Sequence, residues 1–515
     1  MKKTRFLRTL LAVVLCLTLL SACGNNADGG NSDTGGGPSG KDTLIVAVAN
    51  EPTTMDPYGK NDSTSANFKV QVFDTLLALG PDGEAVPCIA ESWEYTDDTT
   101  LVLHIREGVV FHNGEPLTAD DVFYSIGQTM ASTYLQPFVD VIDLEKSTVD
   151  DEHTITLRMT QPCGPLFSQL CYVYIVPQKY HTEKGAEAFA EEPVGSGPFA
   201  LDKWVRGDRL EYTANDQYWG VKPAVKKLIM RVIAEPSSRT VEIESGGVDI
   251  AMNISASDLP MLGENPDVQV LRADSYNNCF IGFDCTLAPY DNKLVRQAIS
   301  CAIDKESIVQ TVYGTTGSVA DGPISPAIWG YNPDLKPYSY DPDKAKKLLS
   351  DAGYPDGIDV VITTSDAQLR IDIAEMVQNQ LGAVGIRTSV EVLENATYLD
   401  KIVNGGFQMY ILTWPTYTGD ADYGLSDTFH TGSATWANTA RYSSPEVDEL
   451  LDIGANTIDQ DTRRDAYYKA QELIVEDCPW VFLWNSEEIA VARSNIQGLE
   501  APPSGRYSFN KVTFA

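Results

Sequence analysis

One short segment of the sequence concentrates side chains suited to holding a small molecule. Residues 413–423 read Thr-Trp-Pro-Thr-Tyr-Thr-Gly-Asp-Ala-Asp-Tyr. The indole of Trp414 and the phenol of Tyr417 offer flat surfaces for stacking, and the carboxylates of Asp420 and Asp422 can accept hydrogen bonds from a cationic group. The segment therefore predicts non-covalent binding, although a solvated acidic turn beneath a core tryptophan also fits it.

The residue types that commonly act in catalysis do not occur at the spacings of the common catalytic motifs. The chain has five histidines, and no two of them form the HExxH pattern of metalloproteases. Gly195-Ser196-Gly197 is one residue short of a nucleophile elbow, and no glycine-rich loop is followed by the GK[ST] of a nucleotide-binding loop. We therefore expect no enzyme activity, no catalytic residue, no metal site and no cofactor.

The cysteines predict thiols rather than a disulfide framework. Nine are present, and the spacings contain no CxxC pair of the kind that binds structural zinc. Cys16 and Cys23 fall in the N-terminal segment treated below, which leaves an odd number, so at least one thiol stays free. We expect mostly buried, small apolar thiols, with a Cys163–Cys171 disulfide as the alternative. The seven remaining cysteines are Cys88, Cys163, Cys171, Cys279, Cys285, Cys301 and Cys478.

The elements that position the polar segment alternate between strand and helix. Residues 358–363, 386–392 and 407–412 have strand patterns, and the two intervening stretches have apolar residues at helical spacing, the first ending at Gly385. This β-α-β-α-β order predicts right-handed crossovers and a largely parallel sheet.

Ligands of such sheets bind outside the carboxyl ends of the strands, and the strand 407–412 ends directly before Thr413. We favour Asp420 over Asp422 as the acceptor of a ligand cation, because Asp420 follows Gly419 and lies nearer the strand end. Two further segments are expected to face the same cleft, one containing Met55 and the other Trp436. Arg370 is a weaker candidate for binding a ligand carboxylate, since an arginine at the start of a helix is usually solvated.

The first half of the chain has a different pattern. Short alternating strands such as 101–105 and 154–158 are separated by turn signals, and Thr118 is a good N-cap for a helix with Asp120 and Asp121 in its first turn. The mixture predicts an α+β subdomain inserted into a first lobe.

The N-terminus has the features of an export signal. Basic residues precede the apolar run 10–20, which is too short for a bilayer that takes about 20 residues to span. Leu20-Ser21-Ala22-Cys23 resembles a bacterial lipobox, in which the cysteine is lipidated. We expect a signal peptide over 1–22, then lipidated Cys23 and a flexible, glycine- and serine-rich tether over 23–42.

The net charge limits the partners that the protein can bind, and the length indicates how many domains to expect. With 38 Lys and Arg against 72 Asp and Glu, the formal net charge is −34, which repels nucleic acid. A chain of 515 residues exceeds the roughly 250–300 residues that one core organises. We expect at least two lobes.

Several segments in a common order resemble one family. The central match is Pro193-Val194-Gly195-Ser196-Gly197-Pro198-Phe199, and the resemblance runs from about residue 43 to the C-terminus. The sequence is similar to the peptide/nickel family (family 5) of ABC-transporter solute-binding proteins, within the dipeptide, oligopeptide and glutathione-like branch. Other matching segments are 89–93, 117–122, 204–219, 292–305, 340–355 and 464–479.

The resemblance implies an α/β fold of two lobes around a cleft, with an extra α+β subdomain in the first lobe. We expect lobe I over 43–282 with the subdomain at about 73–190, lobe II over 283–488, and a return to lobe I over 489–515. Peptide binders of this family resemble the 413–423 segment and hold the peptide ammonium with an aspartate shortly after the tryptophan. Here Tyr417 stands three residues after Trp414, so this sequence departs from that pattern.

The expected function is capture of short peptides by lobe closure and delivery to an ABC permease and its ATPase. The expected form is a monomer that stays outside the cytoplasm, lipid-anchored to the cell membrane at the cell surface or in the periplasm. The alternatives are a sugar, opine or haem ligand on the same scaffold, or a peptide-sensing receptor.

Overall fold

The computed structural model describes residues 41–60, 62–80, 83–433 and 437–515. Residues 41–515 form one compact unit.

A large mixed sheet runs through this unit. Its strand order is β15-β14-β16-β12-β17-β11-β1-β10-β9-β8, and β13 pairs with β17 beside this path. The strands are β1 (Thr43–Val48), β8 (Phe199–Val205), β9 (Arg209–Ala214), β10 (Lys227–Val232), β11 (Ile250–Met252), β12 (Val268–Phe283), β13 (Gly317–Val319), β14 (Ile358–Ser365), β15 (Ile386–Leu393), β16 (Met409–Pro415) and β17 (Trp480–Arg493).

Helices pack against this sheet and against the smaller sheets of the subdomain described below. They are α1 (Ser63–Val72), α2 (Ala119–Ala131), α3 (Leu166–Leu170), α4 (Gln178–Lys184), α5 (Ala186–Glu191), α6 (Pro236–Ser245), α7 (Leu259–Glu264), α8 (Lys293–Ala302), α9 (Lys305–Ile308), α10 (Pro342–Asp351), α11 (Gln368–Gly382), α12 (Asn395–Asn404), α13 (Ala421–Phe429), α14 (Pro445–Ala455) and α15 (Gln460–Asp477).

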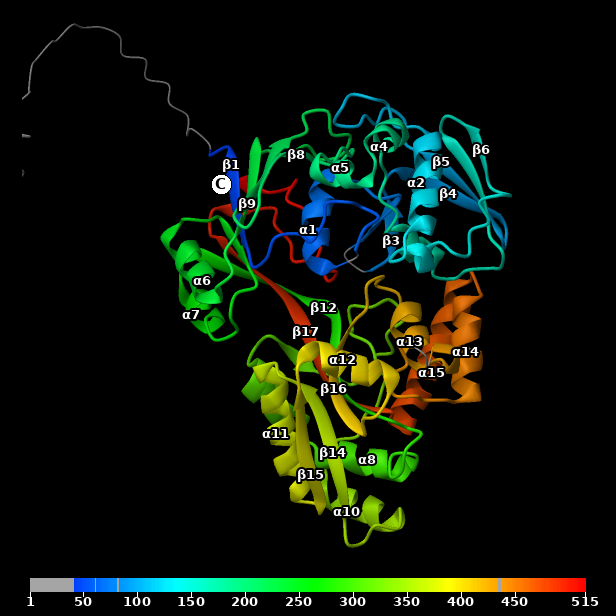
Figure 1. Cartoon of the computed structure of the whole chain (residues 1–515), viewed down its shortest axis with the longest axis vertical. Coiled ribbons are helices and arrows are strands. Elements are labelled where there is room, and N and C mark those ends of the chain that lie inside the picture. Colours follow the sequence, from blue (N-terminus) through cyan, green and yellow to red (C-terminus); the bar gives the residue numbers. More distant parts are fainter. Residues whose placement is uncertain (1–40, 61, 81–82, 434–436) are drawn as a thin grey trace, which may run out of the picture. The chain divides into compact units, whose positions relative to one another are not determined.

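The long antiparallel strands β12 and β17 connect two lobes (Figure 1). Near Val268 and Arg493 they pair beside β11 and β1, and near Phe283 and Trp480 they reach β16. We call the part around β1 and β8–β11, with the subdomain and residues 494–515, lobe I. Lobe II is the part around β14–β16 with helices α8–α15. Each lobe has its own apolar cores.

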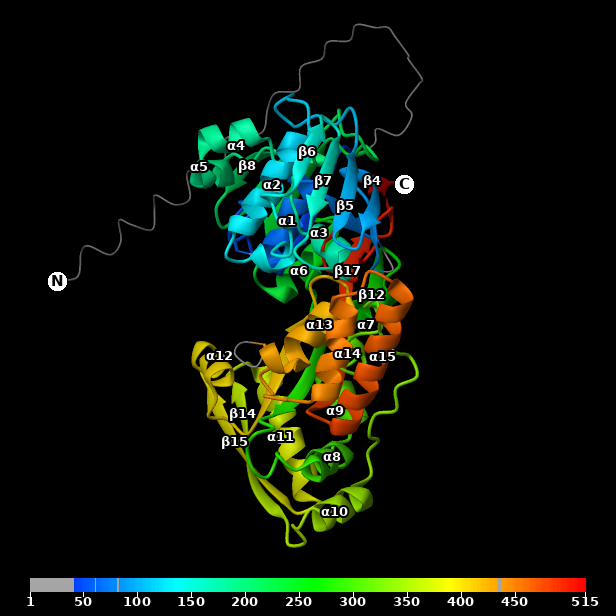
Figure 2. The same ribbon diagram turned by 90° about the vertical axis from the view of Figure 1, so that its right-hand side faces the viewer.

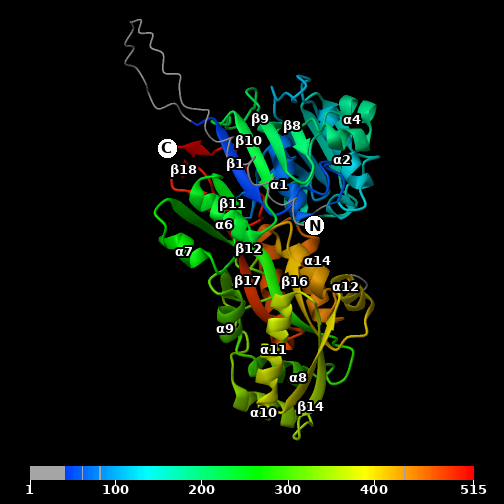
Figure 3. The same ribbon diagram turned by 60° about the vertical axis from the view of Figure 1, so that its left-hand side comes forward.

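The β-α-β-α-β prediction for lobe II is confirmed. β14 pairs in parallel with both β15 and β16, and α11 and α12 form the two crossovers (Figure 3). Two of the strand starts, at Ile358 and Ile386, are as expected, and the other strand ends differ by one to three residues. This part of the fold could be predicted from the sequence, because apolar side chains at helical spacing and alternating strand residues are local signals.

A four-stranded antiparallel sheet forms the subdomain of lobe I (Figure 2). A separate core, from Leu76 to Ile175, lies beneath it. Thr118 begins α2 as expected, and its amide and its hydroxyl both donate to Asp121 Oδ2 at 3.0 Å. The strands of this subdomain are β2 (Leu77–Leu79), β3 (Ala85–Pro87), β4 (Ala90–Asp97), β5 (Thr100–Ile105), β6 (Thr148–Asp151) and β7 (Thr154–Arg158); β2 and β3 form a separate hairpin.

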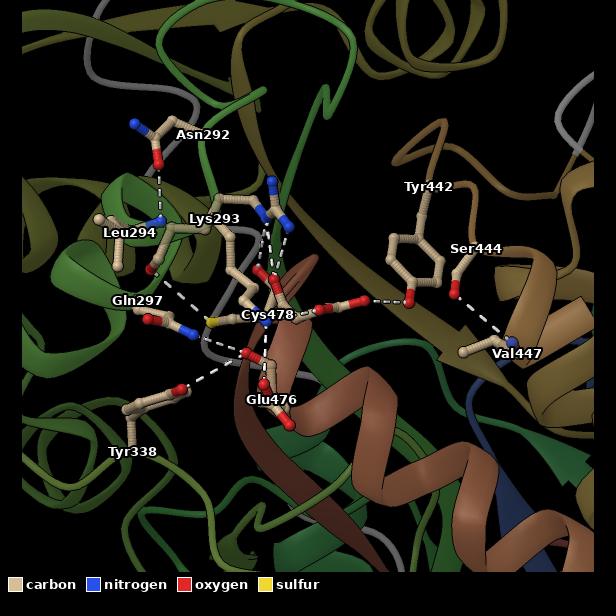
Figure 4. Close-up of polar contacts among 12 residues, drawn as sticks. Asn292, Lys293, Leu294, Gln297, Tyr338, Tyr442, Ser444, Val447, Glu476 and Cys478 are labelled. Carbon is tan, nitrogen blue, oxygen red and sulfur yellow. Dashed lines mark hydrogen bonds and ion pairs between the residues drawn. The ribbon is translucent and has the colours of Figure 1, made fainter. Parts of the chain in front are cut away.

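The segment 292–299, which matched the family in sequence, lies where α8 meets the end of α15 (Figure 4). Arg296, 6% exposed, donates to the carbonyls of Tyr290, Asp477 and Cys478. Gln297 donates to the carbonyl of Glu476 at 2.8 Å. Carbonyls at a helix C-terminus lack partners within the helix, so these side chains cap α15 and fix it to α8.

All seven cysteines of the described residues are free thiols, and six of them are buried. Burial raises the pKa of each of these six buried thiols. They pack as small apolar side chains, which is the form the sequence favoured.

Candidate ligand-binding cleft

A cavity of about 250 Å³ opens where the two lobes meet. β1 and β11 of lobe I and β16 of lobe II all end at it, so its floor lies at the carboxyl ends of these strands, as the sequence predicted. The lining segments are 48–50, 62–68 at the start of α1, 252–253, 276–277 of β12, 415–417, Glu488 of β17 and the loop 503–506.

Tyr417 lines the cavity, and its carbonyl accepts a hydrogen bond from the hydroxyl of Tyr172 in lobe I. A second contact between the lobes is the hydrogen bond that the amide of Gly164 donates to the carbonyl of Ala455 at 2.7 Å. The cleft wall thus includes a place where main chain of lobe II is bonded to lobe I.

Trp414 is the second-to-last residue of β16 and is not among the residues that line the cavity. Its half-buried indole stacks against Tyr423 with ring centroids 6.2 Å apart, and it packs against the core of lobe II. Trp414 supports the loop on which Tyr417 stands.

The placement of Asp420 differs from the expected one. Its carboxylate, 5% exposed, accepts from Arg463 Nη2 at 2.8 and 3.0 Å and caps α13 by accepting from the amide of Asp422 at 2.9 Å. Arg463 is 1% exposed. The cation that Asp420 holds is therefore a side chain of the protein.

Asp422 also points into the protein. It accepts from Ser426 at 2.8 Å and from Tyr467 at 3.2 Å. Burial and the adjacent charge of Asp420 raise the pKa of Asp422. Neither carboxylate is among the residues that line the cavity.

Met55 likewise lies away from the cavity wall. It is fully buried in the core of lobe I, so the expectation that it faces the cleft is corrected. Arg370 lies over the ring of Tyr398 at 5.5 Å and donates to Ser365. Trp436 and Cys23 lie outside the described residues.

Charged side chains that the sequence analysis missed line the cavity. Arg506 comes from the return segment and Glu488 from β17. Burial raises the pKa of Glu488 to about 7. The only sequence signal for Arg506 was a charged residue directly after Pro-Pro-Ser-Gly, which marks a loop but not its location.

A third charge on this wall is already satisfied within the protein. Asp62 accepts from the amide and hydroxyl of Ser65 and from the hydroxyl of Thr53. Although burial opposes ionisation, these hydrogen bonds lower the pKa of Asp62. The cavity thus presents carboxylates and a guanidinium together, beside tyrosines and asparagines.

Comparison with known proteins decides the family. Residues 84–436 match the family model of bacterial extracellular solute-binding proteins, family 5 (middle region). The chain belongs to family 5 of these solute-binding proteins.

The similarity of this family 5 protein to known proteins extends over nearly the whole chain. Haem-binding protein A of Haemophilus influenzae is 27% identical, over 98% of this chain and 99% of that protein. The glutathione-binding protein GsiB of Shigella dysenteriae is 27% identical, over 90% and 93%.

Solved structures show the same fold. HbpA2 of Haemophilus parasuis has a TM-score of 0.85 at 26% identity, with 92% of this chain and all of that one covered. The ABC transporter-associated periplasmic binding protein DppA of Helicobacter pylori, in complex with the peptide STSA, has a TM-score of 0.76 at 26% identity, covering 92% and 98%.

The described residues hold neither a membrane-crossing helix nor a metal cluster. No helix in the described ranges combines the length and apolar character that a bilayer requires. Nor do three or more His, Cys, Asp or Glu side chains gather there as metal ligands would.

Proposed function

We propose that this family 5 protein is the receptor of an ABC importer, captures short peptides in the cleft between its lobes and delivers them to the permease. The observation that carries the proposal is the cavity at the strand ends, where carboxylates and a guanidinium stand together beside tyrosines. A short peptide is a zwitterion with variable side chains, and such a wall complements both of its charges.

The size of the cavity supports a small ligand. At about 250 Å³ it is slightly smaller than the roughly 300–1,000 Å³ that ligand pockets span. A few amino-acid residues fit such a space better than a macrocycle such as haem.

Closure of the lobes is the proposed mechanism of capture. β12 and β17 are the long strands that join the lobes, and both contribute to the cavity. A ligand that contacts both lobes stabilises the closed arrangement, which the permease then recognises.

The proposed location is outside the cytoplasm, with the monomeric protein held to the membrane by a lipid on Cys23. The family is extracellular, and the lipobox-like Leu20-Ser21-Ala22-Cys23 follows an apolar run. Residues 24–40 then supply a polar tether.

Thermal unfolding with a panel of free di- and tripeptides, glutathione and haem tests the ligand class. Peptides are expected to raise the unfolding temperature of the wild type, because a ligand that binds only the folded state stabilises it. Tyr417→Ala should weaken that shift, while Tyr340→Ala, a tyrosine 50% exposed, should not.

Native mass spectrometry of the protein as purified provides the second readout, since it weighs a co-purified ligand. A shift with haem but with no peptide would contradict the peptide proposal and favour the ligand of the Haemophilus influenzae relative. A shift with no member of the panel would point to the sugar or opine alternative.

A further inference from the structure

Arg506 differs from the other inward-pointing arginines of the described residues. Arg239, Arg296 and Arg463 each donate to several carbonyl or carboxylate oxygens of the protein. For the guanidinium of Arg506, the described part of the chain supplies no ion pair and no side-chain hydrogen bond. Its half-buried charge is thus the exception.

The position of the Arg506 guanidinium is nevertheless fixed. Its carbon lies 3.8 Å from the ring centroid of Tyr172, a side chain 1% exposed. The Tyr172 ring packs against Phe138 at 4.8 Å, and its hydroxyl donates to the carbonyl of Tyr417. The ring is therefore held in place from both lobes.

Stacking leaves the donors of Arg506 unused. The five N–H groups of a guanidinium lie in its plane, whereas the tyrosine covers one of its faces. An acceptor that approaches in that plane can still form two parallel hydrogen bonds, the geometry that arginine makes with a carboxylate. Arg506 keeps its charge at any physiological pH.

Two cavities share this side chain. The cleft cavity and a neighbouring one of about 250 Å³ are both lined by Ser504 and Arg506. The second is bounded by Phe73, Ala78, Leu79 and Pro198 among others, and so is partly apolar. A group bound at Arg506 would lie where the two cavities meet, so its neighbouring parts could enter either one.

Other charges nearby do not neutralise Arg506. Lys69 on α1 is 3% exposed, and burial, with a contribution from the charge of Arg506, lowers the pKa of Lys69 to about 8. Asp62 is bonded to Ser65 and Thr53, and Glu488, whose carboxylate lies close to Gly505, forms no ion pair with Arg506 in the described residues. The surroundings of Arg506 thus include a second cation.

We propose that Arg506 is the anchor for a carboxylate of the bound ligand, and that the protein selects peptides with a free C-terminus or an equivalent carboxylate. This inference rests on the proposed peptide function and adds to it the substrate class. Arg506, the hydrogen-bond donor, lies in lobe I on the loop 503–506, and Tyr417 of lobe II lines the same cavity.

The test is native mass spectrometry with an equimolar mixture of free tripeptides and the same tripeptides with amidated C-termini. The bound peptides are released from the protein and weighed by themselves, because an acid and its amide differ too little in mass to be separated on the intact complex. The wild type is expected to retain the free acids at least 30-fold more strongly, because removing one partner of a desolvated charge pair costs that much affinity. This comparison needs no variant, so it does not depend on how a variant folds.

Variants then assign the preference to the side chain. Arg506→Gln should lose the discrimination, and Arg506→Lys should keep part of it, since lysine keeps the charge but not the planar fork. Arg387→Gln is the matched control, because Arg387 pairs with Asp359 on the exposed surface of lobe II.

The two ways of failing are distinguishable. Equal retention of acids and amides by the wild type, or full discrimination by Arg506→Gln, would overturn the anchor and leave peptide binding intact. Retention of neither form by the wild type would overturn the peptide function and the anchor with it.

Discussion

At the scale of the residue, the Asp420–Arg463 pair allows a test of whether Asp420 has a structural role or a ligand-binding role. Both residues are at most 5% exposed, and Arg463 Nη2 lies 2.8 Å from Asp420 Oδ1. Asp420→Asn leaves Arg463 buried without its counter-charge, so we expect a loss of about 3 kcal/mol in the free energy of unfolding. Peptide affinity should change by less than about threefold, equivalent to under about 0.7 kcal/mol.

Urea unfolding and calorimetry measure the two effects separately. Asp461→Asn is the control, because Asp461 forms an exposed pair with Arg464 and such pairs contribute about 0–1 kcal/mol. Unchanged stability with lost peptide binding in Asp420→Asn would instead support the original assignment of Asp420 to a ligand ammonium.

Glu488 predicts a pH dependence of stability. Burial raises its pKa from an ordinary value of 4.5 to about 7, so the folded state binds the proton more tightly than the unfolded state. The stability gained from that proton is present below about pH 4.5 and is lost as the pH rises through about 7.

Glu488→Gln does not titrate, so its stability relative to the wild type should rise by about 3 kcal/mol between pH 4.5 and 8. Urea unfolding of ligand-free protein across this range measures the difference, with the exposed Glu183→Gln as control. Asp62 and Arg506 line the same cavity and remain in both proteins. A constant difference across the range would show that Glu488 is not desolvated.

At the scale of the element, the 193–199 segment shows why the sequence match contains glycines. A Cβ on Gly195 would lie 2.1 Å from the carbonyl oxygen of Val72 at the end of α1. The segment cannot move away freely, since the amide of Gly197 donates to that same oxygen at 2.9 Å. Close packing of loop against helix, rather than ligand contact, accounts for this motif.

Gly195→Ala is therefore expected to destabilise the protein by about 2–3 kcal/mol through overpacking. Gly263→Ala in α7 is the control, because a Cβ there meets nothing within 4 Å and alanine favours a helix. Thermal unfolding compares the two. Equal unfolding temperatures would mean that the segment shifts without cost.

At the scale of the whole molecule, the cysteines predict insensitivity to reductant. The seven free thiols of the described residues contribute as apolar side chains, so protein starting at Thr43 should unfold at the same temperature with or without reductant. Loss of a native disulfide commonly costs ~2–5 kcal/mol, so a clear drop on reduction would reveal a bridge such as Cys163–Cys171.

The anchor is a separate prediction at this scale. Cys23→Ala should release the protein from membranes into the soluble fraction, because an apolar run of 11 residues, 10–20, does not span a bilayer that needs about 20. Fractionation and immunoblotting of cells that express each form measure this. Unchanged retention on the membrane would contradict lipidation at Cys23.

The sequence by itself determined the elements and the family. The strands and helices of residues 358–415 follow from side-chain periodicity, and Thr118 marks the start of α2, because both signals are local and depend on neighbours a few residues away. The order of motifs along the chain indicated family 5, and the position of the cleft at the strand ends followed from the β-α-β order.

Only the tertiary structure decided which side chains line the cavity. Asp420 and Arg463 are far apart in sequence, as are Arg506 and Tyr172, so no local pattern reveals either pair. An aspartate after a tryptophan looks the same in the sequence whether its carboxylate faces a cavity or a buried arginine. Burial and ion pairing arise from segments that meet only on folding, which is why Tyr417 was found from the sequence while Arg506 and Glu488 were not.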